Sequence, residues 1–192
     1  MCLVILIALA GTAYLAVFFT RRAKADLERL LVPLAESIDG ESDIDEAEVS
    51  GKFGGTIAQG RMAGAAAGTV TLWQTDLIDS AGGEEWNYVY SRPNPKKKNP
   101  DAEIDIVTES ADLRAWLETW TVHDLRLIRP AETDWVQVEY SPEAGRIRVA
   151  RPIHGRNGIP NPEDFGKDLE FAESIGTLNR ARQERLVAES TE

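Results

Sequence analysis

Cysteine and histidine are nearly absent from this 192-residue chain, which holds one cysteine, Cys2, and two histidines. A single cysteine excludes an internal disulfide. His123 and His154 stand in no H-E-x-x-H pattern, so a zinc site would have to recruit carboxylates from distant positions. No G-x-S-x-G elbow occurs either. These absences predict a protein that is not an enzyme and holds no metal.

Nucleotide-binding motifs are also missing, although six glycines crowd residues 51–68. Neither the G-x4-G-K-[ST] loop that cradles phosphates nor the G-x-G-x-x-G turn occurs there. The net charge of −11 argues against nucleic acid as a partner, because phosphates would be repelled. The acidic run 36–48 lacks the spacing of a calcium loop. We therefore expect no cofactor.

The chain begins instead with an uncharged, mostly apolar run, Met1 to Thr20. As a helix of about 1.5 Å per residue it would span roughly 30 Å, the thickness of a bilayer's hydrocarbon core. A cleaved signal peptide is the alternative, but it would need a positively charged start and a shorter apolar core. The run therefore predicts a retained transmembrane helix over residues 1–20.

The residues that flank this run predict its orientation. Arg21, Arg22, Lys24 and Arg29 all follow it, and no cation precedes it. Because cations stay on the cytoplasmic side, we expect a single-pass inner-membrane protein with its N-terminus outside and its C-terminal domain in the cytoplasm. The basic collar at residues 21–29 is then placed to contact anionic lipid headgroups.

Small residues recur inside the predicted span, where Ala8, Thr12 and Ala16 follow one another every four positions beside Gly11. Such a face lets another helix approach closely, which predicts packing against other integral membrane subunits. The alternative is that alanine is simply common in membrane helices.

Residues 21–48 predict a juxtamembrane amphipathic helix followed by an acidic linker. Leu27, Leu31 and Leu34 belong to an i, i+4, i+7 apolar stripe. Pro33 is expected to kink or divide this helix. The linker, within residues 36–48, carries seven acids and no base.

Residues 49–160 predict a strand-rich α+β domain. Apolar and aromatic side chains take every second position in several segments, among them 86–90, 104–106 and 136–140. The turn residues 141–145 predict a hairpin over 135–150. One helix interrupts the strands, with Ser110 as its cap.

Residues 161–192 predict a C-terminal helix and tail, with Asn161 at the N-cap and Pro162 at the first helical position. The predicted fold is therefore a single N-terminal transmembrane helix plus a small α+β domain, mainly an antiparallel sheet with two packed helices.

Basic side chains are candidates for docking against this acidic background. They are the collar residues Arg21, Arg22 and Lys24, the proline-bounded loop residues Lys96, Lys97 and Lys98, and the strand residues Arg146, Arg148 and Arg151. Either later patch would suit an acidic protein surface or lipid phosphate. The alternative is that these cations only keep exposed turns and strand edges soluble.

Together these features predict a noncatalytic accessory subunit of an integral membrane protein complex, with a bacterial photosynthetic or respiratory assembly as the candidate host. Its cytoplasmic domain would contact partner subunits. The alternative is a membrane-tethered sensor or adaptor that binds a small ligand or a soluble protein.

Overall fold

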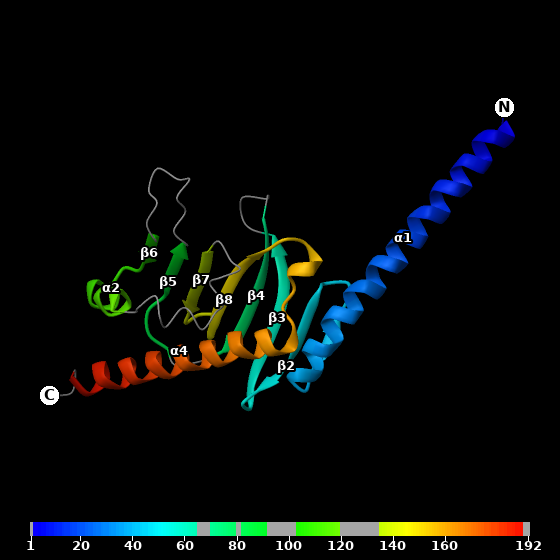
Figure 1. Cartoon of the computed structure of the whole chain (residues 1–192). Helices are drawn as coiled ribbons and strands as arrows, with labels where there is room; N and C mark the ends of the chain where they lie inside the picture. Colours follow the sequence, from blue (N-terminus) through cyan, green and yellow to red (C-terminus); the bar gives the residue numbers. More distant parts are fainter. Residues whose placement is uncertain (1, 65–69, 80–81, 92–102, 120–134, 190–192) are drawn as a thin grey trace.

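The computed structural model describes residues 2–64, 70–79, 82–91, 103–119 and 135–189, and leaves the side chains of 2–10, 13, 103 and 135 undescribed. Within these ranges the chain forms one eight-stranded antiparallel sheet and three α-helices (Figure 1). The strands are β1 (Glu41–Asp43), β2 (Glu48–Phe53), β3 (Thr56–Gly64), β4 (Thr71–Ile78), β5 (Trp86–Ser91), β6 (Glu103–Val107), β7 (Trp135–Ser141) and β8 (Arg146–Ile153). The helices are α1 (Cys2–Ser37), α2 (Ala111–Glu118) and α4 (Pro162–Glu189), and η1 (Arg156–Gly158) is a short 3-10 turn.

The predicted fold class is wrong in its first element. In the part of the chain that the structure describes, no helix is long and apolar enough to cross a membrane. The apolar run is not a separate element, because α1 continues without a break from Cys2 to Ser37 and its later turns carry charged and core residues. Pro33 lies inside this helix and does not divide it. The prediction of a single-pass inner-membrane protein, with its two-sided orientation, is overturned by the same finding.

The sheet also extends into the stretch predicted to be an acidic linker. Residues 36–48 contain the end of α1, all of β1 and the first residue of β2. The strand order is β1-β2-β3-β4-β8-β7-β5-β6, and every neighbouring pair is antiparallel. The predicted hairpin is confirmed as β7–β8, which turns through Pro142 to Gly145.

Alternation along the strands gives the sheet two chemically different faces. On one face Tyr88 lies opposite Val138, which lies opposite Val149, and all three side chains are buried. Trp86, Tyr140 and Ile147 form the next buried row. Successive strand residues point to opposite sides, so the polar residues between them lie on the other face.

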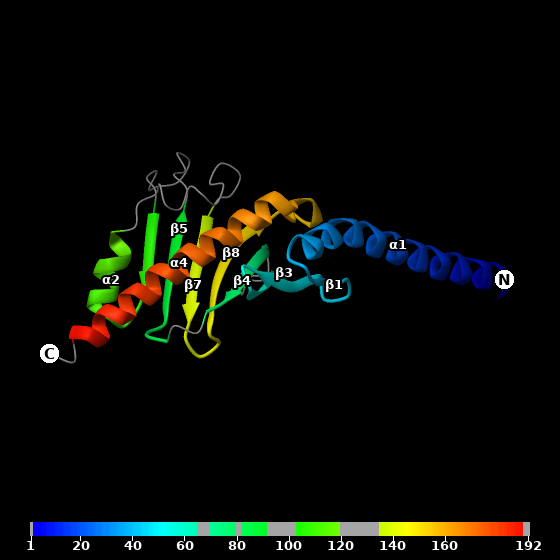
Figure 2. The same cartoon turned by 90° about the horizontal axis from the view of Figure 1, so that it is seen from below.

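Helix α4 covers the apolar face. It begins at Pro162 after the predicted cap, and the Asn161 side chain accepts a hydrogen bond of 2.9 Å from the Asp164 N–H. Figure 2 shows α4 lying diagonally across the strands. Near its start, the Phe165 ring meets the Trp73 ring edge to face at 6.0 Å. A Cβ on Gly60 would lie 2.6 Å from Trp73 and 2.9 Å from Phe165, so these rings need a glycine beneath them.

The second half of α1 belongs to the same core. Leu27, Leu31, Leu34 and Ile38 are buried, as their helical spacing predicts. This half of α1 packs on β1, β2 and the beginning of α4. The first half projects away from the domain as a single helix, toward the end marked N in Figures 1 and 2.

Two charge pairs attach α4 to the rest of the fold, one of them buried and the other with a half-exposed arginine. Asp168 of α4 accepts from the Arg151 guanidinium of β8 at 2.9 Å, and Thr75 of β4 lies 3.5 Å from the same carboxylate. Further along α4, the Arg180 guanidinium donates a hydrogen bond of 2.8 Å to the Asp79 carboxylate, which directly follows β4. The Arg151 and Asp168 side chains are both more than nine-tenths buried, so their charges depend on each other rather than on water.

Breaking the Arg151–Asp168 pair from one side should strongly destabilise the fold. We expect Arg151→Met to lower the free energy of unfolding by about 3–5 kcal/mol, because the Asp168 carboxylate would remain buried without its cation. The double variant Arg151→Met/Asp168→Leu should lose clearly less, since no buried charge remains. Urea unfolding of the full chain measures both values, and a double variant as unstable as the single one would contradict this account.

Candidate functional site

The first half of α1 presents apolar side chains that the domain does not cover. We call residues 11–22 of α1 the arm. Tyr14, Val17 and Phe19 are 70%, 52% and 62% exposed, and Leu15 and Phe18 are also exposed. The Tyr14 and Phe18 rings stack one helical turn apart, with centroids 6.5 Å from each other. Exposed apolar groups therefore surround the arm rather than forming one stripe.

The small residues predicted to pack against another helix lie on this arm or just before it. Gly11, Thr12 and Ala16 are exposed, whereas Ala8 lies in α1 with its side chain outside the described residues. A Cβ built on Gly11 would meet nothing within 4 Å. Among the described residues, nothing therefore covers Gly11.

The basic collar forms the junction between arm and domain. Arg21 and Arg22 are exposed. Lys24 pairs with Asp45 of the β1–β2 turn. Arg156 donates to the Ala23 carbonyl at 2.7 Å. The direction of the arm is therefore set by contacts with two separate loops of the domain.

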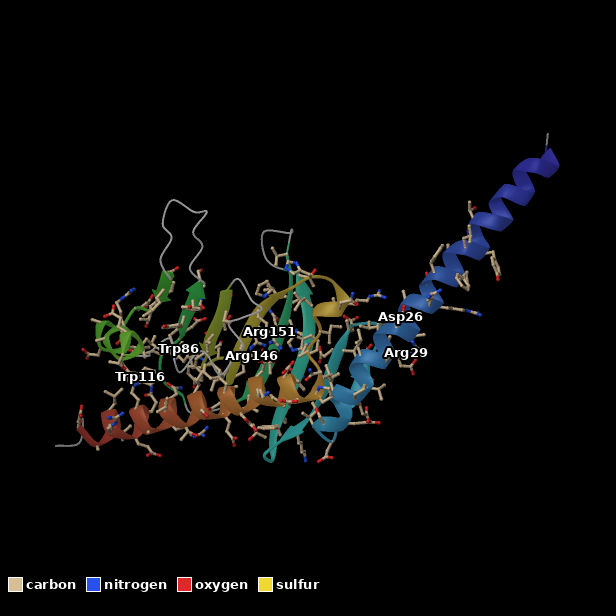
Figure 3. All side chains as sticks on the ribbon, viewed as in Figure 1. Asp26, Arg29, Trp86, Trp116, Arg146 and Arg151 are labelled. Atoms are coloured by element: carbon tan, nitrogen blue, oxygen red, sulfur yellow. The ribbon has the colours of Figure 1, made fainter. Side chains whose placement is uncertain are left out.

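The basic strand residues Arg146, Arg148 and Arg151 do not form one surface. Figure 3 shows Arg146 and Arg151 near the middle of the sheet, above α4 in this view. Arg148 is buried and donates to both Asp76 oxygens, at 2.7 and 2.8 Å, and Arg146 lies 3.7 Å from the same carboxylate. The Arg151 side chain points to the other face of the sheet from Arg148, the face that α4 covers, and pairs there with Asp168.

The Arg148–Asp76 hydrogen bonds raise the pKa of the Arg148 guanidinium above its usual value, while burial acts in the opposite direction. Arg148 is therefore charged at neutral pH and lies directly against the buried Asp76 side chain. Lys96, Lys97 and Lys98, the other candidate patch, lie outside the described residues.

A cavity lies where β8 passes into α4. It measures about 430 Å³ and is lined by Arg151, His154, Asn157, Asn161 and Asp164 among others. His154 is exposed at its rim. In the described ranges, no three His, Cys, Asp or Glu side chains gather in a way that would hold a metal ion.

The face of the sheet opposite α4 carries a second hollow that sequence reasoning missed. It measures about 740 Å³ and lies over β5, β6 and β7. Its lining includes four glutamates, Glu84, Glu85, Glu109 and Glu139, together with Asn87 and Val107. No sequence signal marks them, because acids are common in this chain and these come from four separate segments.

Tyr140 joins β7 to the segment that follows Asp79. Its hydroxyl donates to the Gly82 carbonyl at 2.8 Å, and its side chain is fully buried. Burial raises the pKa of the Tyr140 phenol above its ordinary 10.0, and the negative charge of nearby Asp79 raises it further.

The Tyr140 phenol should therefore ionise above the ordinary phenol pKa of 10.0. A phenol whose pKa is higher in the folded than in the unfolded chain stabilises the fold fully below pH 10, and this stabilisation falls as pH rises through the folded value. We expect Tyr140→Phe to remove one component of the tyrosinate absorbance titration that lies above pH 10. A titration that keeps this component in Tyr140→Phe would contradict the assignment.

Comparison with known proteins supplies no assignment for these surfaces. No protein-family model, curated protein or solved structure matches this chain. The functional argument therefore depends on the geometry of the arm and of the sheet.

Proposed function

We propose that this chain is a noncatalytic subunit of a protein complex, and that its arm inserts into an apolar groove of a partner subunit. The observation that carries the proposal is the exposed apolar surface of residues 14–19, on a helix whose other half is built into the domain core. Large exposed apolar patches on a folded protein commonly mark interaction sites.

The arm is suited to protein contact because it is already a helix and already fixed in direction. Leu31 and Leu34 are fully buried in the same helix, so binding does not have to order the arm's base. Pre-ordered elements lose less conformational entropy on association than flexible segments do. The contacts of Lys24 with Asp45 and of Arg156 with Ala23 hold the junction.

The chemistry of the partner follows from the side chains of the arm. A helix that is apolar all round is stable where it is enclosed, and Tyr14, Phe18 and Phe19 would fill pockets in a surrounding groove. Fully burying one such phenylalanine contributes about 1.5–3 kcal/mol. The exposed cations Arg21 and Arg22 at the end of the arm favour a groove with an acidic rim.

Site-specific photo-crosslinking in the native host tests the proposal. A photoreactive phenylalanine analogue in place of Phe18 should form one discrete adduct with one protein chain, which mass spectrometry identifies. The matched control carries the analogue in place of Val187, which is 65% exposed near the end of α4. We expect no adduct from the control, because the proposed groove encloses only the arm.

A second measurement asks whether the contact holds the complex together. Phe18→Ser should shift the chain from the size of the complex to that of the free protein in native gel filtration, whereas Val187→Ser should not. Circular dichroism should show the same fold in both variants, because neither side chain belongs to the core. An arm that crosslinks only to lipid, or a complex unaffected by Phe18→Ser, would contradict the proposal.

A further inference from the structure

Asn157 and Gly158 form the one Asn-Gly pair of the sequence, and they lie in η1, the turn between β8 and α4. In such a pair the backbone nitrogen of the glycine can attack the side-chain amide of the asparagine, because glycine has no Cβ to hinder the approach. Asparagine belongs to the thermolabile residues of proteins for this reason. The fold decides whether the two groups can meet.

The structure leaves the Asn157 side chain accessible. Asn157 and Arg156 are exposed and Gly158 is half-buried, so water reaches the whole of η1. Asn157 also lines the cavity of about 430 Å³ at the passage from β8 to α4. Both water and free space are therefore present at the amide that would react.

Few interactions hold the turn closed. The Gly158 N–H donates to the Gly155 carbonyl at 3.2 Å, and the Ile159 N–H donates to the Arg156 carbonyl at 3.1 Å. Among the described residues, no side chain caps the start of the turn. A single 3-10 turn of this kind opens at small cost, because its hydrogen bonds are few and poorly aligned. Opening the first bond frees the Gly158 nitrogen to turn toward the Asn157 amide.

The fold itself requires the glycine of this pair. A Cβ on Gly158 would lie 2.7 Å from the Ile153 Cβ, so a larger residue would force the turn away from the end of β8. The structure therefore keeps the residue that makes Asn157 reactive, whereas the exposed Asn157 side chain can be replaced.

We propose that Asn157 is a site of spontaneous modification, where the asparagine becomes aspartate or isoaspartate through a cyclic imide with Gly158. The Gly158 nitrogen forms a bond to Cγ of Asn157, and the bond from Cγ to Nδ2 breaks. Nδ2 leaves as ammonia, with the proton that the glycine nitrogen gives up. Water then opens the ring. Cleavage between the nitrogen and Cγ gives aspartate, and cleavage between the nitrogen and the backbone carbonyl carbon gives isoaspartate.

The modified residue lies beside the contact that holds the base of the arm. The guanidinium of Arg156 donates to the Ala23 carbonyl of α1 at 2.7 Å. Either product places a new negative charge on the neighbouring residue, and isoaspartate also adds one methylene to the backbone of the turn. The change therefore falls on the turn that carries Arg156 to α1.

A second pair, Asp39-Gly40, can form the same imide, but the fold protects it. The Gly40 N–H donates to the Ala35 carbonyl at 2.9 Å at the end of α1. A Cβ on Gly40 would lie only 2.0 Å from the Ser50 carbonyl oxygen, so this glycine is enclosed between α1 and β2. We expect no isoaspartate at position 39 while the chain is folded.

Peptide mapping of the full chain tests the proposal. Folded protein and protein unfolded in concentrated urea are kept at physiological temperature and neutral pH, then cut after glutamate. The fragment 144–163 contains both Asn157 and Asn161. Asn161 is the internal control, because the nitrogen of Pro162 carries no proton and cannot form the imide. Mass spectrometry with electron-transfer fragmentation distinguishes aspartate from isoaspartate at each position.

We expect both products at position 157 in the folded chain, at a rate within about tenfold of the rate in urea, because opening one exposed turn costs little. Asn161 should stay unchanged. On anion exchange, the intact chain should slowly gain a more acidic species. Asn157→Gln should not gain it, because glutamine would have to close a larger ring, and this variant should keep the fold since the side chain is exposed.

Three results would overturn the proposal. The first is a rate at Asn157 more than about tenfold lower in the folded chain than in urea, which would show that the turn protects the residue. The second is isoaspartate at Asp39 as fast as at Asn157 in the folded chain. The third is an acidic species that accumulates equally in Asn157→Gln.

Discussion

The buried attachment of α4 to the sheet is the constraint on which the rest of the structure depends. Asp168 meets Arg151 of β8, and Asp79 meets Arg180, so that charge pairs on both sides of Ile175 hold the helix across the strands. A helix held in this way buries the aromatic rows of β5 and β7. Because the Arg151 and Asp168 charges are hidden from water and require each other, the position of α4 is specified as well as stabilised.

That attachment decides what the two faces of the sheet can do. One face is filled by α4, with Gly176 passing so close to Asp79 that a Cβ there would lie 2.3 Å from the carboxylate. The other face keeps its polar rows accessible. Arg148 and Arg151 pair with aspartates inside the fold, so neither of these cations is available on the surface. An acidic hollow on the free face is consistent with this distribution.

Helix α1 has two different roles along its length. From Leu27 onward its apolar side chains are part of the core and lie against β1, β2 and α4. Among the described side chains before Ala23, the large apolar ones at residues 14–19 are exposed. The change occurs where Arg156 donates a hydrogen bond to the Ala23 carbonyl and Asp45 forms an ion pair with Lys24. One rigid element thus connects the core to the surface that we propose as the partner-binding site.

The sequence by itself determined the features that depend on near neighbours. The helix that starts after Asn161, the Ser110 cap of α2 and the turn at Pro142 to Gly145 are local, and the structure confirms each one. Alternation in 86–90 and 136–140 correctly predicted strands, because a period of two is visible within a few residues.

Only the tertiary structure decided which distant residues meet. Hydropathy over residues 1–20 predicted a membrane span, but it could not show that the same helix continues to Ser37 and joins the core. Arg148 and Arg151 were expected on a surface, yet their aspartate partners come from β4 and α4, far away in the chain. The hollow lined by Glu84, Glu85, Glu109 and Glu139 arises because β5 pairs with both β7 and β6, and this pairing is not encoded in any short segment.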